Sequence, residues 1–543
     1  MNVLLIDCDL GELPGHTVRS IRLKNGGVVP VERLLNDPSA EGGRFRPDVL
    51  LQKEHLGRRV FLKNLSELNC PKIFWAIDSH LNLFWQRLYA RLFDVVLTPH
   101  KSLFDALPPS WRHFDARTFS EPGSVRKWRP HAARSHAASF VGRIDANRPQ
   151  RSRFARLLRD RHNVVPRVLP FGEMLDLYDD TRTLPNESIC REFNFRIMEG
   201  ASCGCCVLTE DIGEDLLANF EPGREVLTYG NSLEFEELFS FVSTRPAMTE
   251  KIGRAAMQRV RSCHLPGARR DAFLGMLPAL SPRARSSSES EIIFALAFIQ
   301  WARSHPLQEK YAERMRGALG RSSHPQALAM KLRLLVENGR REEASDLLKT
   351  LLDGREPAPP ADDDGLFDLH TACASAALRL GDMPRFALCW DRERRRCPEA
   401  RTPETPFRAC LAWAALLAAT GRICQPGFQF DPRRHCPETA YEMTSMARQW
   451  ISDAADAHEW AKAMAKCCDE SPFPHQALEY RAQLSLDSAD DWRAGLAYSS
   501  ACFDAFLLED GLKEAAIAHE LARKSGEEDA FRQAAGEALF RLL

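Results

Sequence analysis

The chain has 543 residues, of which 44% are hydrophobic and 27% charged, and its formal net charge is −1 at pH 7. This balance is that of a soluble globular protein, and the lack of a basic excess argues against a nucleic-acid binder. No apolar run approaches the roughly 18 residues that span a bilayer, and the start of the chain does not resemble a signal peptide. We therefore expect a cytoplasmic protein of three or four domains whose 16 cysteines are reduced thiols.

The first 130 residues alternate short apolar runs with helical stretches. The runs are NVLLID, GGVVPV, DVLLQ, KIFWAI and DVVLT. A second series covers residues 131–280, with ASFVG, NVVPRV, CCVLT and EVLTYG as strands and an arginine-rich helix from about Pro149. Alternation of buried strands and helices predicts two α/β domains, each with a parallel sheet.

A proline- and serine-rich stretch, from which we take residues 281–288 as a linker, separates these domains from a helical half. Within residues 289–543, Gly339, Gly381 and Gly421 recur about 40 residues apart. The pattern resembles tetratricopeptide (TPR) repeats, which are helix-turn-helix units with a usual period of about 34 residues. We therefore predict a TPR-like α-solenoid over this half of the chain.

The most informative segment is FNFRIMEGASCGCCVLT, residues 193–209, which is followed by FEPGREVLTYG. It predicts a helix that ends at a glycine and then a short buried strand. Arg196 and Glu199 lie three residues apart, and so on one face of the helix. A carboxylate there can accept hydrogen bonds from two sugar hydroxyls, and an arginine can hold a phosphate. The segment therefore predicts a nucleotide-sugar site.

The pattern R-x-x-E-x-x-x-x-G-x-x-x-L-T, followed by F-E-P-G-R-E-V, resembles the donor-binding half of GT-B glycosyltransferases. Among these it is most similar to the CgeB-like proteins and their family 4 relatives. The similarity covers roughly the first half of the chain and is strongest over residues 140–264. It implies two Rossmann-like domains: an acceptor-side domain at 1–130 and a nucleotide-sugar-binding domain at 131–280.

The resemblance assigns Glu199 to the donor ribose. The fuller family motif has a second glutamate eight residues earlier, where this chain has Arg191. Asn194 and Arg196 are expected to replace its contacts with the donor sugar. Gly142 and Gly204 complete the set of expected donor-binding residues.

Phe140 to Arg143 predict a strand, a tight turn and a cation. Family 4 members place an arginine after this glycine and a lysine a few residues later, and both neutralise the departing diphosphate. Arg143 matches the first cation, while Arg148 and Arg151 both fit the second. Fixed cations and a helix N-terminus can stabilise the leaving group, so we expect no metal requirement.

Asp78 and His80 follow the KIFWAI strand. Parallel sheets present ligands at the carboxyl ends of their strands, so either side chain could orient or deprotonate an acceptor hydroxyl. The structural alternatives are a helix N-cap for Asp78 and a loop histidine for His80. His131, in the segment expected to cross between the two α/β domains, is a weaker candidate for the cleft.

Two other motifs favour structural roles. The cysteines of Cys203–Cys206 lack the paired Cys-x2-Cys spacing of zinc ligands, and small residues suit a tight turn from helix to strand. Asp362 to Asp364 resemble the acidic metal motif of the other glycosyltransferase fold, but a proline-rich loop surrounds them. We expect a solvated loop there.

These observations predict a cytoplasmic, metal-independent glycosyltransferase that uses a nucleotide-diphosphate sugar, with retention of configuration implied by the family. The helical half favours a protein acceptor, because solenoids offer long concave surfaces. If that half only recruits the acceptor, a chain ending near Pro282 should still bind the sugar donor. The competing hypothesis is a non-catalytic interaction protein with a degenerate sugar-nucleotide module.

Overall fold

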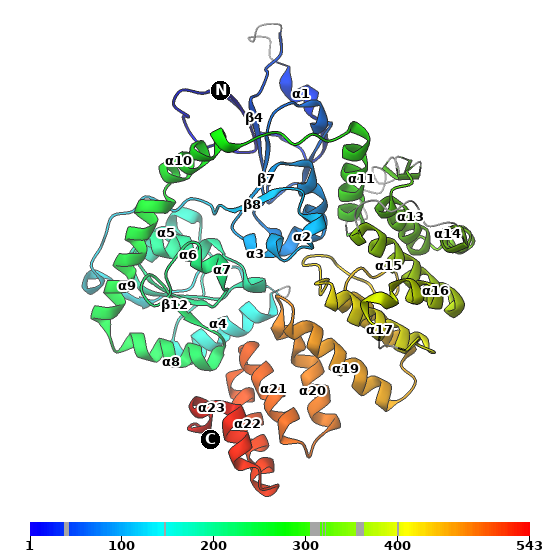
Figure 1. Ribbon diagram of the computed structural model, residues 1–543. Helices are drawn as coiled ribbons and strands as arrows, with labels where there is room; N and C mark the ends of the chain where they lie inside the picture. The colour runs from blue at the N-terminus through cyan, green and yellow to red at the C-terminus, as the bar shows by residue number, and fades with distance from the viewer. Residues whose placement is uncertain are drawn as a thin grey trace. The chain divides into compact units, whose positions relative to one another are not determined.

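The computed structural model describes residues 1–36, 43–145, 148–304, 315–317, 319–320, 322–353, 363–398 and 401–543. The chain forms two compact units (Figure 1). Unit 1 contains Met1–Ser120 and Ala272–Asp456, and unit 2 contains Glu121–Asp271 and Ala457–Leu543. Each unit therefore combines an α/β portion with a later helical segment. The division at residues 130, 280 and 288 stays a prediction, and Asp362 lies outside the described residues.

The described residues of unit 1 contain a six-stranded parallel sheet. In spatial order its strands are β2 (Thr17–Ile21), β1 (Asn2–Ile6), β4 (Val49–Lys53), β6 (Lys72–Trp75), β7 (Val95–Thr98) and β8 (Asp115–Thr118). Leu4 and Ile6 enter one hydrophobic core, whereas Val3 and Leu5 enter another on the opposite face. Burial of both faces explains why the central strands read as continuous apolar runs.

Short helices and a second small sheet complete the α/β portion of unit 1. The small sheet pairs β3 (Gly27–Pro30) with β5 (Val60–Lys63) in parallel. The helices are α1 (Val31–Leu35), α2 (Ser79–Tyr89) and α3 (Lys101–Asp105). All residues of α2 except Leu81 are buried, because the helix lies between the sheet and the helical segment of the same unit.

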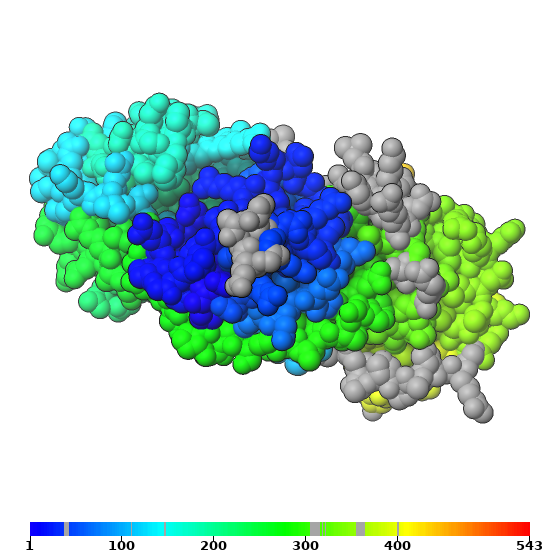
Figure 2. Space-filling view, turned by 90° about the horizontal axis from the view of Figure 1, so that it is seen from above, coloured from blue at the N-terminus to red at the C-terminus, as the bar shows by residue number. Residues whose placement is uncertain are grey.

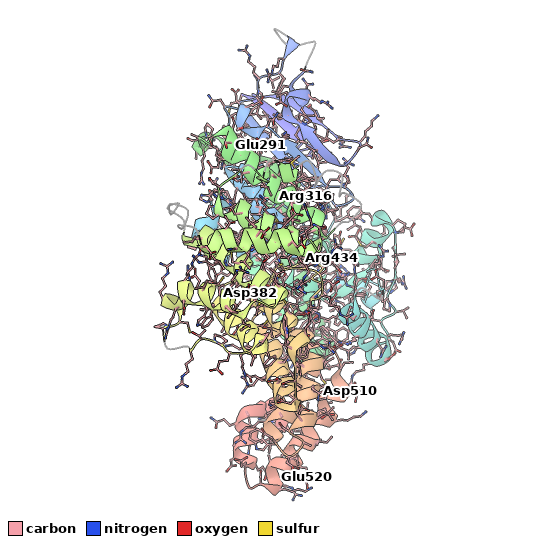
Figure 3. The ribbon with its side chains drawn as sticks, turned by 90° about the vertical axis from the view of Figure 1, so that its right-hand side faces the viewer. Glu291, Arg316, Asp382, Arg434, Asp510 and Glu520 are labelled. Atoms are coloured by element: carbon pink, nitrogen blue, oxygen red, sulfur yellow. The ribbon has the colours of Figure 1, made fainter. Side chains whose placement is uncertain are left out.

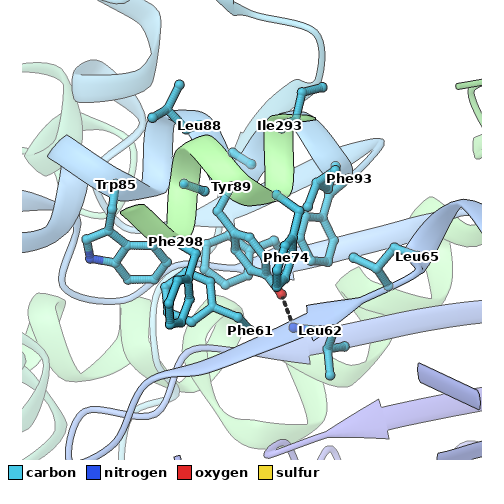
Figure 4. Packing of buried hydrophobic residues seen from close by; sticks show 14 of the residues in the cluster. Phe61, Leu62, Leu65, Phe74, Trp85, Leu88, Tyr89, Phe93, Ile293 and Phe298 are labelled. Atoms are coloured by element: carbon cyan, nitrogen blue, oxygen red, sulfur yellow. Dashed lines mark hydrogen bonds between the residues drawn. The ribbon is translucent and has the colours of Figure 1, made fainter. Parts of the chain in front are cut away.

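Helix α11 (Ser287–Arg303) packs directly on the α/β portion of unit 1. The ring of Phe61 lies 5.3 Å from that of Phe298 and 5.5 Å from that of Trp301. Beside them the Tyr89 hydroxyl accepts a hydrogen bond of 2.7 Å from the Leu62 N–H, which Figure 4 shows within the aromatic cluster. Figure 2 likewise shows residues after 272 lying against the N-terminal residues. This helical segment and the α/β portion therefore share one core.

The remaining helices of unit 1 continue this segment. They are α13 (Pro325–Glu337), α14 (Arg341–Asp353), α15 (Asp363–Leu380), α16 (Met383–Glu393), α17 (Pro406–Ala419) and α18 (Ala440–Ala447), and Asp382 marks the start of α16 in Figure 3. Helix α19 (Ala454–Asp469) spans the boundary with unit 2. Gly339, Gly381 and Gly421 all have φ between 71° and 78°, the left-handed conformation that ends a helix. The helical character of this half is confirmed, while its assignment to TPR repeats stays a prediction.

The described residues of unit 2 contain a four-stranded parallel sheet. Its order is β12 (Leu227–Tyr229), β11 (Cys206–Glu210), β10 (Thr181–Asn186) and β9 (His136–Ala138). A parallel bridge between Val141 and Arg167 continues the pattern beside β9. The helices of this portion are α4 (Pro149–His162), α5 (Phe171–Asp179), α6 (Phe195–Ser202), α7 (Glu214–Leu217), α8 (Ser232–Ser243), α9 (Pro246–Arg259) and α10 (Pro266–Met276), the last of which reaches into unit 1.

The C-terminal helices of unit 2 cover one side of its sheet. They are α20 (Leu478–Asp487), α21 (Trp492–Asp504), α22 (Leu508–Lys524) and α23 (Glu528–Phe540). Phe506 lies 4.8 Å from the ring of Phe154 on α4, in a core that also contains Phe235 and Tyr229. A chain ending near Pro282 would therefore lose part of the core of both units. The shared cores weigh against the expectation that such a chain binds the sugar donor by itself, and that expectation stays untested.

Both α/β portions have the parallel, helix-covered sheets of Rossmann-like domains, which confirms the fold class predicted from the sequence. Among the described residues, no helix combines the length and apolar character needed to cross a bilayer.

Candidate functional site

Several predicted residues gather at the carboxyl edge of the unit 2 sheet, where parallel α/β folds bind ligands. Gly142 lies just beyond β9, and its N–H donates to Arg167 O at 2.9 Å. A Cβ atom at Gly142 would stand 2.7 Å from Nη2 of Arg196, so a larger residue would displace that guanidinium. The glycine therefore lets α6 approach the loop closely.

Arg196 fixes the geometry of this edge. Its Nε donates to Val141 O at 3.0 Å, and its Nη1 donates to Asn186 Oδ1 at 2.6 Å. The guanidinium lies over the Phe140 ring at 4.4 Å. Burial lowers the pKa of Arg196 from its ordinary value. Because these contacts join α6 to the loops after β9 and β10, Arg196 is placed as a positioning residue, and its predicted contact with the sugar donor stays untested.

Glu199 lies one helical turn after Arg196 and is half-buried. Burial raises the pKa of its carboxyl to about 7, although the neighbouring charge of Arg196 acts in the opposite direction. Among the described residues, no hydrogen bond reaches its carboxylate oxygens. A carboxylate of this kind can accept hydrogen bonds from ligand hydroxyls, as the sequence predicts for the ribose.

Asn194 and Glu187 stand beside Arg196. Asn194 precedes α6, and its Nδ2 donates to Glu187 O at 3.1 Å. Its Oδ1 is buried and has no hydrogen-bond partner within the described residues. The Glu187 carboxylate accepts from Arg151 Nε at 2.7 Å, and both side chains are buried. Since Arg151 is held by this ion pair, Arg148 is favoured as the second cation.

Arg143 and Arg148 flank the loop that leads into α4. The side chain of Arg143 is 76% exposed, and its Nε lies 3.3 Å from a carboxylate oxygen of Asp145. Arg148 directly precedes the 14-residue helix α4, whose first residue is Pro149. The first N–H groups of a helix lack intrahelical acceptors, so this N-terminus together with two arginines is suited to an anion.

Gly204 lies at the opposite, amino-terminal edge of the sheet, two residues before β11. It has φ of 72°, and a Cβ atom there would stand 2.8 Å from the Trp128 ring. Its carbonyl oxygen lies 2.9 Å from Nε2 of His131. This histidine is buried, and the burial lowers the pKa of its imidazole. Neither residue lies at the edge where a sugar donor is expected, and the position of Gly204 does not favour the donor contact predicted for it.

The surroundings of the neighbouring cysteines also favour a structural role. Cys203, Cys205 and Cys206 are all fully buried. Burial raises the pKa of each thiol well above its usual range. Protonated, enclosed thiols are poor nucleophiles and metal ligands, in keeping with the turn role expected for this segment.

Asp78 and His80 lie in unit 1, after strand β6. Asp78 precedes α2, and the N–H groups of Ile77 and Asp78 donate to one Glu54 carboxylate oxygen at 2.8 and 3.0 Å. Glu54 is itself buried, and we did not anticipate its role. Glu54 directly follows β4 and so lies at the carboxyl end of a parallel strand. Asp78 was selected as a candidate because of the same position after β6, and this criterion applies to Glu54 as well. His80 is buried, with its ring 5.0 Å from that of His100.

A cavity of about 400 Å³ opens at the carboxyl ends of β10, β11 and β12. It is lined by Gln150, Ser188, Cys190, Arg191, Glu210, Asp211, Ile212, Gly213, Gly230, Pro472, Pro474, His475 and Asp504. Burial raises the pKa of Glu210 to about 8 and that of Asp504 to about 6. No motif in the sequence points to these two groups, because Glu210 and Asp504 are nearly 300 positions apart in the chain. None of the predicted donor-binding residues is among those that line it.

The α/β portion of unit 2 is similar to a known protein family. Residues 133–275 match the family model described as glycosyl transferase-like. This segment is similar to glycosyl transferase-like domains. It contains β9 to β12, the loop with Arg143 and helix α6 with Glu199.

Solved structures show weaker similarity. The chain is 12% identical to a chain of the GtfA/B complex, over 42% of this chain and 57% of that one, with a TM-score of 0.31. It is 13% identical to sucrose-phosphate synthase from Thermosynechococcus elongatus, over 51% and 98%, with a TM-score of 0.36. It is 9% identical to the pneumococcal O-GlcNAc transferase GtfA in complex with UDP and GlcNAc, over 42% and 56%, with a TM-score of 0.29. No curated protein matches the chain significantly.

Proposed function

We propose that this protein is a glycosyltransferase that moves a sugar from a nucleotide-diphosphate donor to a hydroxyl acceptor. One observation carries the proposal: within the glycosyl transferase-like segment, an exposed Arg143 stands before the N-terminus of α4, and Glu199 offers a carboxylate that no group in the described part of the chain donates to. The first arrangement suits a diphosphate and the second suits sugar hydroxyls.

In this proposal the diphosphate lies beside Gly142, Arg143 and Arg148. Arg143 and Arg148 neutralise the charge that grows on the leaving group, so the reaction needs no metal ion. Glu199 accepts hydrogen bonds from the ribose, and the buried Asn194 Oδ1 accepts one from the donor sugar. Arg196 holds the three surrounding segments in place.

Asp78 is the proposed group that orients or deprotonates the acceptor hydroxyl, with His80 as the second candidate. Glu54 positions Asp78 by binding its backbone N–H. Retention of configuration, a cytoplasmic location and a protein acceptor held by the helical segments complete the proposal. Retention rests on the resemblance to family 4, and the protein acceptor rests on the helical surface.

The second candidate function is a non-catalytic module that binds a sugar nucleotide. Arg191 favours it, because an exposed arginine stands where the family motif has a glutamate. The two functions differ in one property: only the enzyme hydrolyses its donor slowly when no acceptor is present.

The first experiment is a panel of nucleotide sugars tested by thermal stability, followed by donor hydrolysis. A ligand at 100 times its dissociation constant adds about 2.7 kcal/mol to the free energy of unfolding. Stabilisation together with slow hydrolysis supports the enzyme, and stabilisation alone supports the module. If no nucleotide sugar stabilises the protein, the proposed function fails.

The role of Arg143 is tested by Arg143→Ala, with Arg156→Ala, an exposed arginine on α4, as the matched control. We expect Arg143→Ala to lower kcat by tenfold or more with a smaller change in donor affinity, because leaving-group charge is largest in the transition state. Activity should persist in EDTA. Equal losses in affinity and turnover would show that Arg143 only binds the phosphate and does not stabilise the leaving group in the transition state. Loss of activity in EDTA that magnesium or manganese restores would exclude the metal-independent mechanism.

A further inference from the structure

Unit 1 contains a cavity of about 430 Å³ that is separate from every site described above. It opens between the start of β6 and the chain that leads into α11. Its lining includes three cationic side chains, those of Lys72, Arg283 and Arg285. A hollow of this volume falls in the range of small-molecule sites.

Lys72 is the first residue of β6 and is only 3% exposed. Its Nζ donates one hydrogen bond of 2.9 Å, to Cys70 O, and lies 3.9 Å from a carboxylate oxygen of Asp94. An ammonium group has three N–H donors, so this buried lysine retains hydrogen-bonding capacity. Burial lowers the pKa of Lys72, and a bound anion would act in the opposite direction.

Asp94 anchors the chain before α11 to the sheet. Its carboxylate accepts from the N–H of Lys72 at 2.7 Å, from the N–H of Arg283 at 2.9 Å and from Nη1 of Arg285 at 3.2 Å. Two cationic side chains, those of Lys72 and Arg285, therefore lie beside this one carboxylate, whereas Arg283 contacts it only through its backbone N–H. With the charge of Arg283, the lining keeps a net positive charge. Two further carboxylates, those of Glu67 and Glu291, line a smaller neighbouring cavity of about 140 Å³.

Helix α11 adds the positive end of its dipole. The helix has 17 residues, and Ser286 caps it by accepting a hydrogen bond of 3.1 Å from Glu289 N–H. Both Ser286 and Ser290 line the cavity. The free N–H groups of the first helical turn and two serine hydroxyls are donors that suit phosphate oxygens.

We propose that this cavity binds a small phosphorylated molecule. The cations supply the charge, the serines and the helix N-terminus supply hydrogen-bond donors, and the volume of the hollow suits a small ligand rather than a membrane surface. Lys72 begins β6 at this edge, whereas Asp78 follows the other end of the same strand. The bound phosphate is therefore not the one that reacts near Asp78, and this site is independent of the proposed glycosyltransferase activity.

The test measures binding of inorganic phosphate and of glucose 6-phosphate to the full chain by calorimetry. Lys72→Met, which keeps the apolar stem, should weaken binding at least tenfold, and Arg283→Ala, which alters an exposed side chain, should weaken it several-fold. Arg112→Ala, an exposed arginine of the same unit, is the matched control and should have no effect. Affinity for the nucleotide sugar that stabilises the protein in the panel described above should be the same in all three variants, which separates this site from the sugar-donor site.

Two results would overturn the proposal. The first is an absence of binding of both phosphate compounds to the unaltered protein, including the case in which vesicles containing phosphatidic acid bind in their place. The second is phosphate binding that Arg143→Ala abolishes and Arg283→Ala leaves intact, since phosphate would then occupy only the sugar-donor site.

Discussion

Glu199 shows how a sequence motif can single out a candidate residue while its chemistry depends on its surroundings. The motif predicts a carboxylate near a sugar donor, and the structure adds that burial raises the pKa of this carboxyl to about 7. The protonated form is a weaker acceptor than the carboxylate. Because the pKa of Glu199 is higher in the folded protein than in the unfolded chain, protonation of this carboxyl stabilises the folded state. This contribution to the free energy of unfolding is fully present below about pH 4.5 and is lost as the pH rises through about 7.

The first prediction follows for binding of the sugar donor. Affinity should increase as the pH rises from 6 to 8, because Glu199 becomes ionised and accepts the ribose hydroxyls. Glu199→Gln should weaken binding at pH 8 by about 1 kcal/mol or more and should flatten the pH profile. Calorimetry at the two pH values checks this, with the exposed Glu173→Gln as the control. An unchanged pH profile in a folded Glu199→Gln protein would contradict the ribose assignment.

Helix α11 illustrates the element scale. Its serine-rich beginning reads as a linker followed by a helix, and Ser286 does cap it. The helix also carries Phe294 and Phe298 into the core of the α/β portion of unit 1, with Phe298 fully buried. A linker marked by composition therefore does not mark the end of a folding unit here.

The second prediction concerns this packing. Phe298→Ala should lower the free energy of unfolding by about 3–5 kcal/mol, because it leaves a cavity beside Phe61. Denaturant unfolding measures the change, and Leu388→Ala, which removes an exposed apolar side chain, should have little effect. A small effect of Phe298→Ala would contradict the shared core.

The third prediction concerns truncation. A chain ending near Pro282 should be insoluble or unfolded, because it exposes Phe61 in unit 1 and Phe154 in unit 2 to water. Expression with size-exclusion chromatography and circular dichroism tests this. If the truncated protein is soluble and folded, the helical half is not needed to complete either core and is an independent domain.

At the scale of the whole molecule, the two units each join segments that are distant in sequence. In unit 1 a network of buried ion pairs also joins segments that are distant in sequence. Nη2 of Arg87, on α2, lies 2.9 Å from Glu438, and Arg303, on α11, pairs with both Glu438 and Glu337. The charge of Arg333, whose Nη1 lies 3.8 Å from Glu438, together with Arg303 and Arg87 holds the pKa of Glu438 well below its usual value despite its burial.

The fourth prediction follows from this network. Glu438→Gln should lower the free energy of unfolding by about 3–5 kcal/mol, because it leaves buried arginines without their partner. Since the pKa of Glu438 is lowered by folding, its contribution is present above about pH 4.5 and is lost as the pH falls. Unfolding measured at pH 7 and pH 4 should show a smaller effect of the substitution in acid. The exposed Glu404→Gln is the control, and equal losses for the two variants would contradict a special role for Glu438.

The sequence by itself determined the local elements and the motif. Apolar runs identified β1, β3, β4, β6, β7, β11 and β12, and the glycine turns marked ends of helices, because both depend on periodicity and backbone freedom within a few residues. NVVPRV, which was predicted as a strand, contributes only the isolated bridge at Arg167, and strand β10 was not predicted. The segment around Glu199 also identified the glycosyl transferase-like domain. The tertiary structure alone decided that Arg151 pairs with Glu187, that Glu54 holds Asp78 and that the helical half is divided between two cores. These features depend on burial and on contacts between segments far apart in the chain, which no local pattern of residues records.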